Sequence, residues 1–307
     1  MTRPGLAKFL FHGVRRVLGL TPPGRSLQIL PDDVFLVSFP KSGNTWTRFL
    51  LASLRFPEEP ATWANINRLV PCPIGSSIND FDRTPRPRII KSHECFDPRY
   101  PRVICIVRDP RDVVVSQYHY SRKTRNIPDD LPVGTFVTRF LAGETCPYGS
   151  WGQNLSTWLY TSEGSPSFLL LRYEDMVADC ARELAKVVDF LHLSVTREQI
   201  VQAVERSSAD RMRKLEKAQT AKNILVKGSR NDLAFVRAAV SGGWRKDLPK
   251  QMVEKIETAW GPLMHHLGYE LTSQTVSEAR LSVPWTSPQF GVGVSPRRQQ
   301  ESSLNGI

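Results

Sequence analysis

The apolar residues of this chain gather in four short runs, at residues 34–39, 88–90, 103–107 and 168–171. Each run is continuous and does not alternate with polar residues. Strands that are buried on both faces, as in a parallel sheet, have this pattern. The runs therefore predict a parallel sheet at the centre of the protein.

Helical spacing of apolar residues occupies the stretches between and after these strands. In the first stretch, Trp46, Phe49, Leu50 and Leu54 would lie on one face of a helix. Further helices are predicted at residues 112–122, 133–142, 151–161, 181–192, 197–206 and 250–267. Strands that alternate with helices define an α/β fold. We predict a single α/β domain with a central parallel sheet flanked by helices.

The two ends of the chain differ from this pattern. The sequence TPPGRS separates a basic segment, residues 1–27, from the predicted domain, residues 28–275. For the basic segment we predict a helix, which either packs on the domain or makes weak contact with a membrane surface. Residues 276–307 are expected to form a disordered tail, because the sequence from Ser287 is rich in Gly, Ser, Pro and Gln.

The formal net charge of +11 favours anionic partners such as nucleotides, nucleic acid or a membrane surface. Lys and Arg before Asp32 supply +5 of it, so the total says little about an active site. The five cysteines are scattered and form no CxxC pair. They argue against a disulfide framework or a zinc site and favour a reducing, cytoplasmic location. No apolar run approaches the length of a membrane span.

A candidate anion site follows the first predicted strand, in the sequence PKSGNTW. Backbone N–H groups of a tight loop and the positive end of a helix together attract an anion. Lys41 adds a full charge, and Ser42, Asn44 and Thr45 add side-chain donors. The residue order differs from GxxxxGK[ST] of nucleotide triphosphatases, so the loop suits one phosphate-like group. An ordinary turn with a surface lysine is the alternative.

A second candidate begins at Arg108, directly after the third predicted strand, in RDPRDVVVSQYHYSR. Asp109 and Pro110 suit the start of a helix, and Asp112 would complete a capping box. Arg108 then lies at the carboxyl end of a buried strand, the edge where open α/β sheets bind ligands. A salt bridge to a neighbouring acid is the alternative role for Arg108.

The sequence KSH at 91–93 follows the second predicted strand. Lys91 and His93 are two residues apart, so their side chains point to the same side. A general base needs a pKa near neutrality, which a histidine provides. A structural histidine is the alternative.

Taken together, these segments resemble those of the PAPS-dependent sulfotransferases of the cytosolic type. VFLVSFPKSGNTW is similar to the family's 5′-phosphosulfate loop, VICIVRDPRDVVVSQYHY to its 3′-phosphate motif, and KSH to its Lys-Thr-His strand end. YGSWGQNLSTW (148–158) and LLLRYEDM (169–176) are similar to two further segments. All five occur in the family's order and span roughly residues 30–270.

The resemblance implies a co-substrate, 3′-phosphoadenosine 5′-phosphosulfate (PAPS), and residues that bind it. Those implied for the 5′-phosphosulfate are Lys41, Ser42, Gly43, Asn44 and Thr45. Trp46 would stack near the adenine, and Tyr173 would hydrogen-bond to it. Those implied for the 3′-phosphate are Arg108, Ser116 and Arg237.

The implied reaction transfers a sulfuryl group to a hydroxyl or amine. Lys91 and His93 would face the transferring group, His93 as general base, while Lys41 would stabilise the leaving oxygen. No metal is needed. The acceptor would be a small molecule or a carbohydrate, not a nucleic acid, and the oligomeric state stays open. Two alternatives are an ATP-dependent phosphoryl transferase of similar fold and a basic, non-catalytic protein that binds nucleotides or nucleic acid.

The sequence departs from the family in its late motif, RAAVSGGWRK at 237–246. Ala238 and Ala239 stand where the family has Lys and Gly, so one cation expected for the 3′-phosphate is missing. Ala209 stands where an aromatic often packs against adenine, and Asn154 where a histidine often lines the acceptor pocket. The replacement of Lys and Gly by Ala238 and Ala239 bears on how tightly the donor binds.

Overall fold

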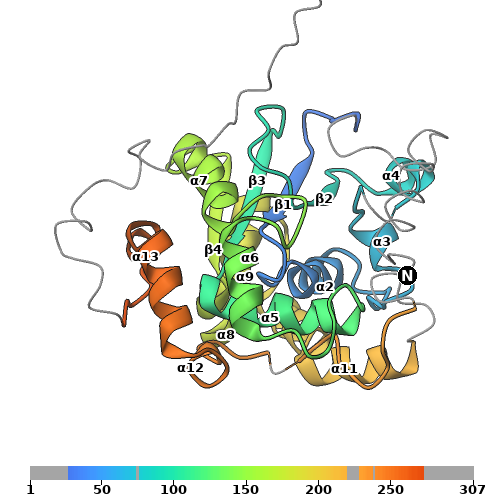
Figure 1. Cartoon of the computed structure of the whole chain (residues 1–307). Coiled ribbons are helices and arrows are strands. Elements are labelled where there is room, and N and C mark those ends of the chain that lie inside the picture. The colour runs from blue at the N-terminus through green and yellow to red at the C-terminus, as the bar shows by residue number, and fades with distance from the viewer. Residues whose placement is uncertain (1–26, 74–75, 220–227, 238, 273–307) are drawn as a thin grey trace, which may run out of the picture.

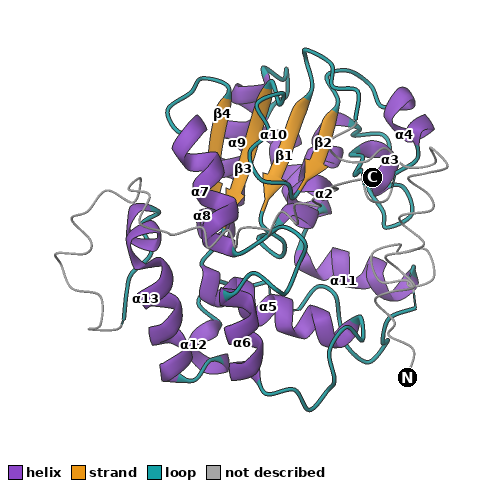
Figure 2. Cartoon of the chain, turned by 45° about the horizontal axis from the view of Figure 1, so that its top comes forward, coloured by secondary structure: helices purple, strands orange, loops and turns teal. Residues whose placement is uncertain are grey.

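The computed structural model describes residues 27–73, 76–219, 228–237 and 239–272. The predicted N-terminal helix and the predicted C-terminal tail lie outside these residues. Within them, four parallel strands form one sheet in the order β2-β1-β3-β4 (Figures 1 and 2). The strands are β1 (Val34–Ser38), β2 (Ile89–Ser92), β3 (Arg102–Val107) and β4 (Phe168–Arg172). The prediction of a central parallel sheet is confirmed.

Helices precede and follow the strands along the chain. They are α2 (Asn44–Arg55), α3 (Ile66–Leu69), α4 (Ile78–Arg83), α5 (Pro110–Lys123), α6 (Val133–Leu141), α7 (Trp151–Ser162), α8 (Tyr173–Ala178), α9 (Cys180–Leu191), α10 (Arg197–Arg206), α11 (Ala209–Ala218), α12 (Trp244–Asp247) and α13 (Lys250–His266). The helices predicted from apolar spacing are all present. The sequence pattern missed α3, α4, α8, α11 and α12.

The sheet is buried on both faces, as its continuous apolar runs predict. Successive side chains of a strand point to opposite faces, so Phe35 and Val37 enter one core and Val34 and Leu36 the other. Apolar residues of α5, α6, α7 and α13 complete the first core. Those of α2, α3, α9 and α10 complete the second.

The carboxyl ends of the strands meet at one edge of the sheet. β1 pairs in parallel with β2, where Val37 lies opposite Ser92, and with β3, where Ser38 lies opposite Ile106. β3 pairs in parallel with β4, where Val107 lies opposite Arg172. The residues that follow these strands are consequently brought together, although they are far apart in the sequence.

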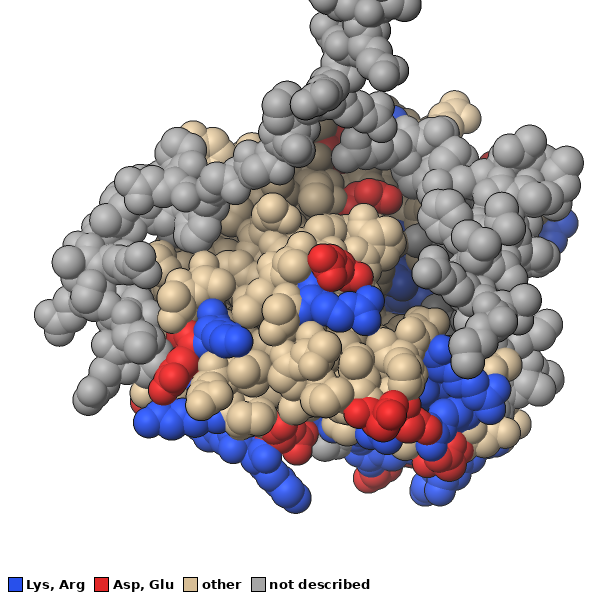
Figure 3. Space-filling view, in the orientation of Figure 1, with Lys and Arg blue, Asp and Glu red and all other residues tan. Residues whose placement is uncertain are grey.

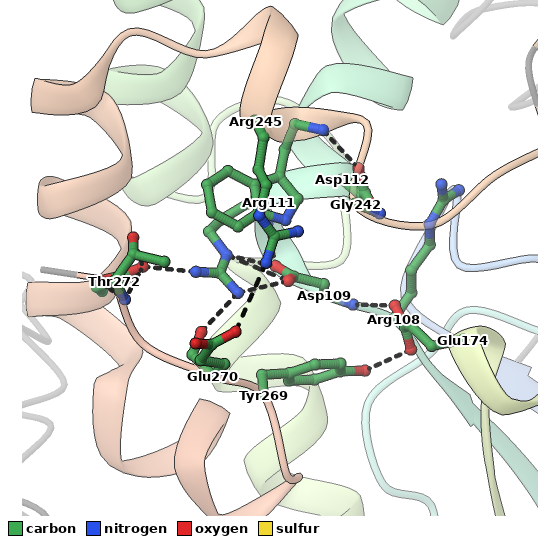
Figure 4. Close-up of polar contacts among 12 residues, drawn as sticks. Arg108, Asp109, Arg111, Asp112, Glu174, Gly242, Arg245, Tyr269, Glu270 and Thr272 are labelled. Carbon is green, nitrogen blue, oxygen red and sulfur yellow. Dashed lines mark hydrogen bonds and ion pairs between the residues drawn. The ribbon is translucent and has the colours of Figure 1, made fainter.

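The start of α5 agrees with the sequence in part. Asp109 caps the helix by accepting a hydrogen bond from the Arg111 N–H, and Pro110 is the first helical residue. The predicted capping box is wrong. The backbone N–H of Asp109 donates to Glu174, and the carboxylate of Asp112 accepts the N–H groups of Gly242 at 2.7 Å and Trp244 at 2.9 Å (Figure 4). Asp112 therefore fastens the late segment of the chain to α5.

Candidate active site

A cavity of about 860 Å³ lies at the carboxyl edge of the sheet. The predicted site residues that line it are Lys41, Gly43, Asn44, Thr45, Trp46, Lys91, His93, Arg108, Ser116, Tyr173 and Arg237. Ser42 is the exception: it is fully buried and does not line the cavity. The structure thus brings together residues from all four strand ends and from the late segment.

The loop between β1 and α2 has a tightly constrained backbone. Lys41 and Gly43 both have positive φ, 72° and 103°. A Cβ added at Gly43 would lie 2.7 Å from the Tyr173 ring, so the residue must be glycine for steric reasons too. The side-chain amide of Asn44 donates to the Leu36 carbonyl and to the Ser38 hydroxyl, both at 3.1 Å. These contacts hold the loop against the end of β1.

The ammonium of Lys41 lies between two aromatic rings. Its Nζ is 4.4 Å from the ring centroid of Tyr120 and 4.4 Å from that of Phe235. Burial lowers the pKa of Lys41 to about 7, and the charges of Arg108 and Lys91 add to the effect. A bound anion would raise this pKa again. A buried ammonium at this position is therefore suited to contact an anionic group.

The orientation of His93 is determined by its hydrogen bonds. Its Nδ1 lies 2.7 Å from the carbonyl oxygen of Ser38, which only accepts, so Nδ1 carries the proton and Nε2 keeps a lone pair. Burial lowers the pKa of His93 well below 6.5, and the nearby Lys91 lowers it further. The ring is therefore neutral near pH 7. A neutral imidazole with a free Nε2 is able to accept a proton.

Asn154 holds the backbone of His93 through a hydrogen bond. Its side-chain amide donates to the His93 carbonyl at 3.1 Å and to the Tyr148 carbonyl at 3.5 Å. Asn154 is fully buried and is not among the described residues that line the cavity. Asn154 thus stands where the family often has a pocket histidine, and its amide holds the backbone of His93 in place.

Arg108 connects three parts of the site. Its guanidinium donates to the Lys41 carbonyl at 3.2 Å and to the Val240 carbonyl at 3.1 Å. It also lies over the Tyr173 ring, 4.0 Å from the centroid. Its Nε is buried and has no hydrogen-bond partner among the described residues. Arg108 therefore has unused capacity for an anionic ligand.

A face of α5 forms one wall of the cavity. Asp112, Ser116 and Tyr120 follow each other at intervals of four residues, and all three line the cavity. Ser116 was predicted from the sequence and Tyr120 was not, although their helical spacing was visible. Phe235 was not predicted either, because it lies two residues before Arg237 and meets the Tyr120 ring only in the folded chain.

The cavity wall that carries Trp46 and Tyr173, the two residues expected to contact the adenine, is aromatic. The rings of Trp46 and Tyr173 meet edge to face, with centroids 5.8 Å apart, and both line the cavity. Ala209 also lines it, where the family pattern often has an aromatic residue. Ala238 lies outside the described residues.

Beneath the site, a buried polar network joins β3 to the C-terminal part of the domain (Figure 4). The Arg111 side chain, 2% exposed, forms ion pairs with Asp109 at 2.6 Å and with Glu257 of α13 at 2.5 Å. Glu174 accepts the Asp109 N–H at 3.0 Å and the Tyr269 hydroxyl at 3.1 Å. This network fixes the strand end that carries Arg108.

The cavity carries a surplus of positive charge among the described residues. Its cationic residues are Lys41, Lys91, Arg108, Arg237 and Lys246, and its carboxylates are Asp112 and Asp247. On the outer face that Figure 3 shows, basic and acidic side chains are intermixed along the lower edge. The positive surplus at the cavity therefore favours an anionic ligand there.

A parallel α/β sheet with a cationic cavity and a neutral histidine at its carboxyl edge has the arrangement of an enzyme that acts on an anionic substrate. The chain belongs to the sulfotransferase family: the model of the sulfotransferase domain matches residues 31–268. This match covers all four strands and the residues that line the cavity at their carboxyl ends.

Several known proteins similar to this chain carry the name sulfotransferase. Sulfotransferase 1A1 of Bos taurus is 30% identical over 79% of this chain and 86% of its own length. Sulfotransferase 2B1 of Mus musculus is 29% identical over 84% of this chain and 80% of its own length. The solved structure of mouse sulfotransferase SULT7A1, complexed with PAP, is similar with a TM-score of 0.63 and 25% identity, over 78% of this chain and 86% of that one.

Two further properties concern the described part of the chain. None of its helices combines the length and the apolar character needed to cross a membrane. Nor does it contain a group of three or more His, Cys, Asp or Glu side chains arranged to hold a metal ion.

Proposed function

We propose that this protein transfers a sulfuryl group from PAPS to a hydroxyl or amine of a small molecule. The observation that carries the proposal is the convergence of the family's separate motifs on one cavity with a surplus of positive charge. Membership of the sulfotransferase family supports it, as does the PAP bound in the similar mouse structure. We also propose that residues 28–275 form the domain, which the matched range 31–268 supports.

In this proposal the loop and its neighbours bind the donor. Lys41 and the N–H groups at the start of α2 contact the 5′-phosphosulfate. Arg108, Ser116 and Arg237 contact the 3′-phosphate. The adenine lies against Trp46 and Tyr173. Arg108 must then give up a carbonyl bond, and charge-assisted bonds to the phosphate replace it.

His93 acts as the general base of the proposed reaction. Its Nε2 takes the proton of the acceptor hydroxyl or amine as that atom bonds to sulfur. The bond between sulfur and the bridging oxygen breaks, and that oxygen leaves with the 5′-phosphate. Lys41 and Lys91 stabilise the charge that develops on it. Positioning of the reactants supplies much of the remaining rate enhancement.

We further propose a small-molecule acceptor and a cytoplasmic location. The Tyr148 ring lies 5.5 Å from the His93 ring, and Tyr148, Cys146 and Gln117 all line the cavity, which suits a small acceptor with both apolar and polar groups. All five cysteines are free thiols, which supports a cytoplasmic location. A carbohydrate acceptor remains an alternative that an acceptor screen decides.

The first test is the effect of nucleotides on the melting temperature. Adenosine 3′,5′-bisphosphate should raise it far more than adenosine 5′-phosphate, because hydrogen bonds to a charged group contribute about 1.5–3 kcal/mol each. ATP, offered at the same concentration, tests the phosphoryl-transfer alternative. Equal shifts from bisphosphate and monophosphate would refute the 3′-phosphate site. A sulfonate-donor assay with a panel of phenols, alcohols and amines then identifies the acceptor.

A further inference from the structure

The 3′-phosphate end of the proposed donor site is short of positive charge. Where the family pattern has a lysine after the arginine, this chain has Ala238. The remaining Arg237 is also partly compensated, because its guanidinium lies 3.5 Å from the carboxylate of Asp247. A donor with a doubly charged phosphate at this end would therefore need a cation from another part of the chain.

Lys246, the last residue of RAAVSGGWRK, has no role implied by the family resemblance, and it lines the cavity. It lies on the short helix α12, directly before Asp247, the partner of Arg237. This places Lys246 at the same end of the cavity as Arg237.

The position of α12 is fixed by hydrogen bonds to α5, which forms one wall of the cavity. Asp112 of α5 accepts the N–H groups of Gly242 and Trp244, at the entry to α12. Ser116, a candidate for the 3′-phosphate, lies one helical turn beyond Asp112 on the same face. The two hydrogen bonds hold the segment with Lys246 beside the wall that carries Ser116.

The charge of Lys246 is not used by the protein itself. Within the described part of the chain, its ammonium forms no ion pair and no hydrogen bond, and its side chain is exposed. Two nearby basic residues differ: Arg245 pairs with Glu270 at 3.7 Å, and Lys250 pairs with Glu254 at 4.0 Å. Neither of these lines the cavity. Lys246 alone of the three combines an unpaired charge with a position in the cavity wall.

We propose that Lys246 binds the 3′-phosphate of the donor and supplies the cation that Ala238 does not provide. The inference rests on the proposed function, because it assumes that the donor carries a 3′-phosphate. The ammonium and the guanidinium groups of Arg108 and Arg237 would then contact the phosphate from different sides, with Ser116 as a neutral donor. The additional cation for the 3′-phosphate thereby comes from α12, not from the residue after Arg237.

Binding measured by calorimetry tests the assignment with two ligands and three proteins. The ligands are adenosine 3′,5′-bisphosphate and adenosine 5′-phosphate, and the proteins are wild type, Lys246→Ala and Lys250→Ala. Lys246→Ala should weaken bisphosphate binding roughly tenfold and change monophosphate binding less than twofold, because only the first ligand has the contacted group. Lys250→Ala removes the same charge four residues away and should leave both affinities unchanged. Lys246→Arg should retain most of the affinity for the bisphosphate.

The outcomes separate the inference from the proposed function. If wild type binds both ligands equally, the 3′-phosphate site itself is wrong. If wild type prefers the bisphosphate and Lys246→Ala keeps that preference, the proposed function stands and the role of Lys246 is refuted. An equal loss for Lys246→Ala and Lys250→Ala also refutes it, since this would be a general effect of net charge. Melting temperatures of all variants establish that each one is folded.

Discussion

Burial lowers the pKa of both His93 and Lys41, and in each case neighbouring cations add to the effect. The two consequences differ. A neutral His93 is ready to accept a proton, whereas Lys41 needs a bound anion to regain its full charge near pH 7. Binding of an anionic donor therefore restores the charge on Lys41. The same anion favours protonation of His93, as the proposed reaction requires.

Replacing His93 by Ala tests the general-base assignment at the residue scale. The turnover number should fall roughly a hundredfold or more, the usual contribution of a general base. Donor affinity should change little, because other residues make the proposed donor contacts. His265→Ala is the matched control, because His265 is exposed on α13 and does not line the cavity. A folded His93→Ala protein with near-normal turnover would contradict the assignment.

The pH profile gives an independent check on His93. Its folded-state pKa lies well below 6.5, so kcat/KM of the free enzyme should stay level near pH 7 and fall only below about pH 6.5. Stability should follow the same direction. The unfolded chain takes up the proton first, so the contribution of neutral His93 to stability is lost as pH falls below about 6.5. An acidic limb centred above pH 7 would contradict this interpretation.

The loop between β1 and α2 can be tested as an element through Gly43. Gly43→Ala should lower both stability and donor affinity, since it combines an unfavourable backbone, about 1–2 kcal/mol, with a 2.7 Å approach to Tyr173. Gly164→Ala is the matched control: Gly164 also has a positive φ, 82°, but its added Cβ meets nothing within 4 Å. Urea unfolding and bisphosphate titration measure both effects.

The comparison of these two glycine variants isolates the contact with Tyr173. Both carry the backbone cost, so Gly43→Ala should be the less stable of the two, and only it should weaken bisphosphate binding. If the two variants lose the same stability and both bind the bisphosphate normally, the close packing of Tyr173 on the loop has no role in donor binding.

The strands and long helices were predictable because each carries a periodic apolar signal over many residues. The short helices α3, α8 and α12, with four or six residues, span too few turns for such a signal. α11 is longer, but charged residues dominate it, and only Met212 and Glu216 are buried. Asp112 was misread for a different reason. Local spacing suggested a capping box, whereas its actual partners lie 130 and 132 residues away.

At the scale of the whole molecule, the location of the site followed from topology. Residues after parallel strands meet at one edge, so the motifs at Lys41, His93 and Arg108, each predicted at a strand end, come together in the folded chain. What the sequence did not reveal were contacts between segments with no fixed spacing, such as Phe235 against Lys41. The same reason explains Lys246, whose place in the cavity depends on the distant carboxylate of Asp112.

The buried network around Arg111 joins the strand end before α5 to α13. Arg111→Ala would leave the carboxylates of Asp109 and Glu257 buried without their cation, and the Glu257 side chain is 0% exposed. Removal of one partner from a buried ion pair costs about 3–5 kcal/mol of unfolding free energy. Arg245→Ala breaks an exposed pair with Glu270 and should cost less than about 1 kcal/mol.

Urea unfolding, followed by tryptophan fluorescence and by circular dichroism, measures the effect of Arg111→Ala on the whole domain. If the network joins the two parts into one cooperative unit, both probes should shift to lower urea together. Separate transitions would show that α13 unfolds independently of the sheet. A loss no greater than that of Arg245→Ala would mean that Arg111 stabilises the domain no more than a surface arginine does. In that case another contact, such as the bond between Tyr269 and Glu174, would have to join these elements.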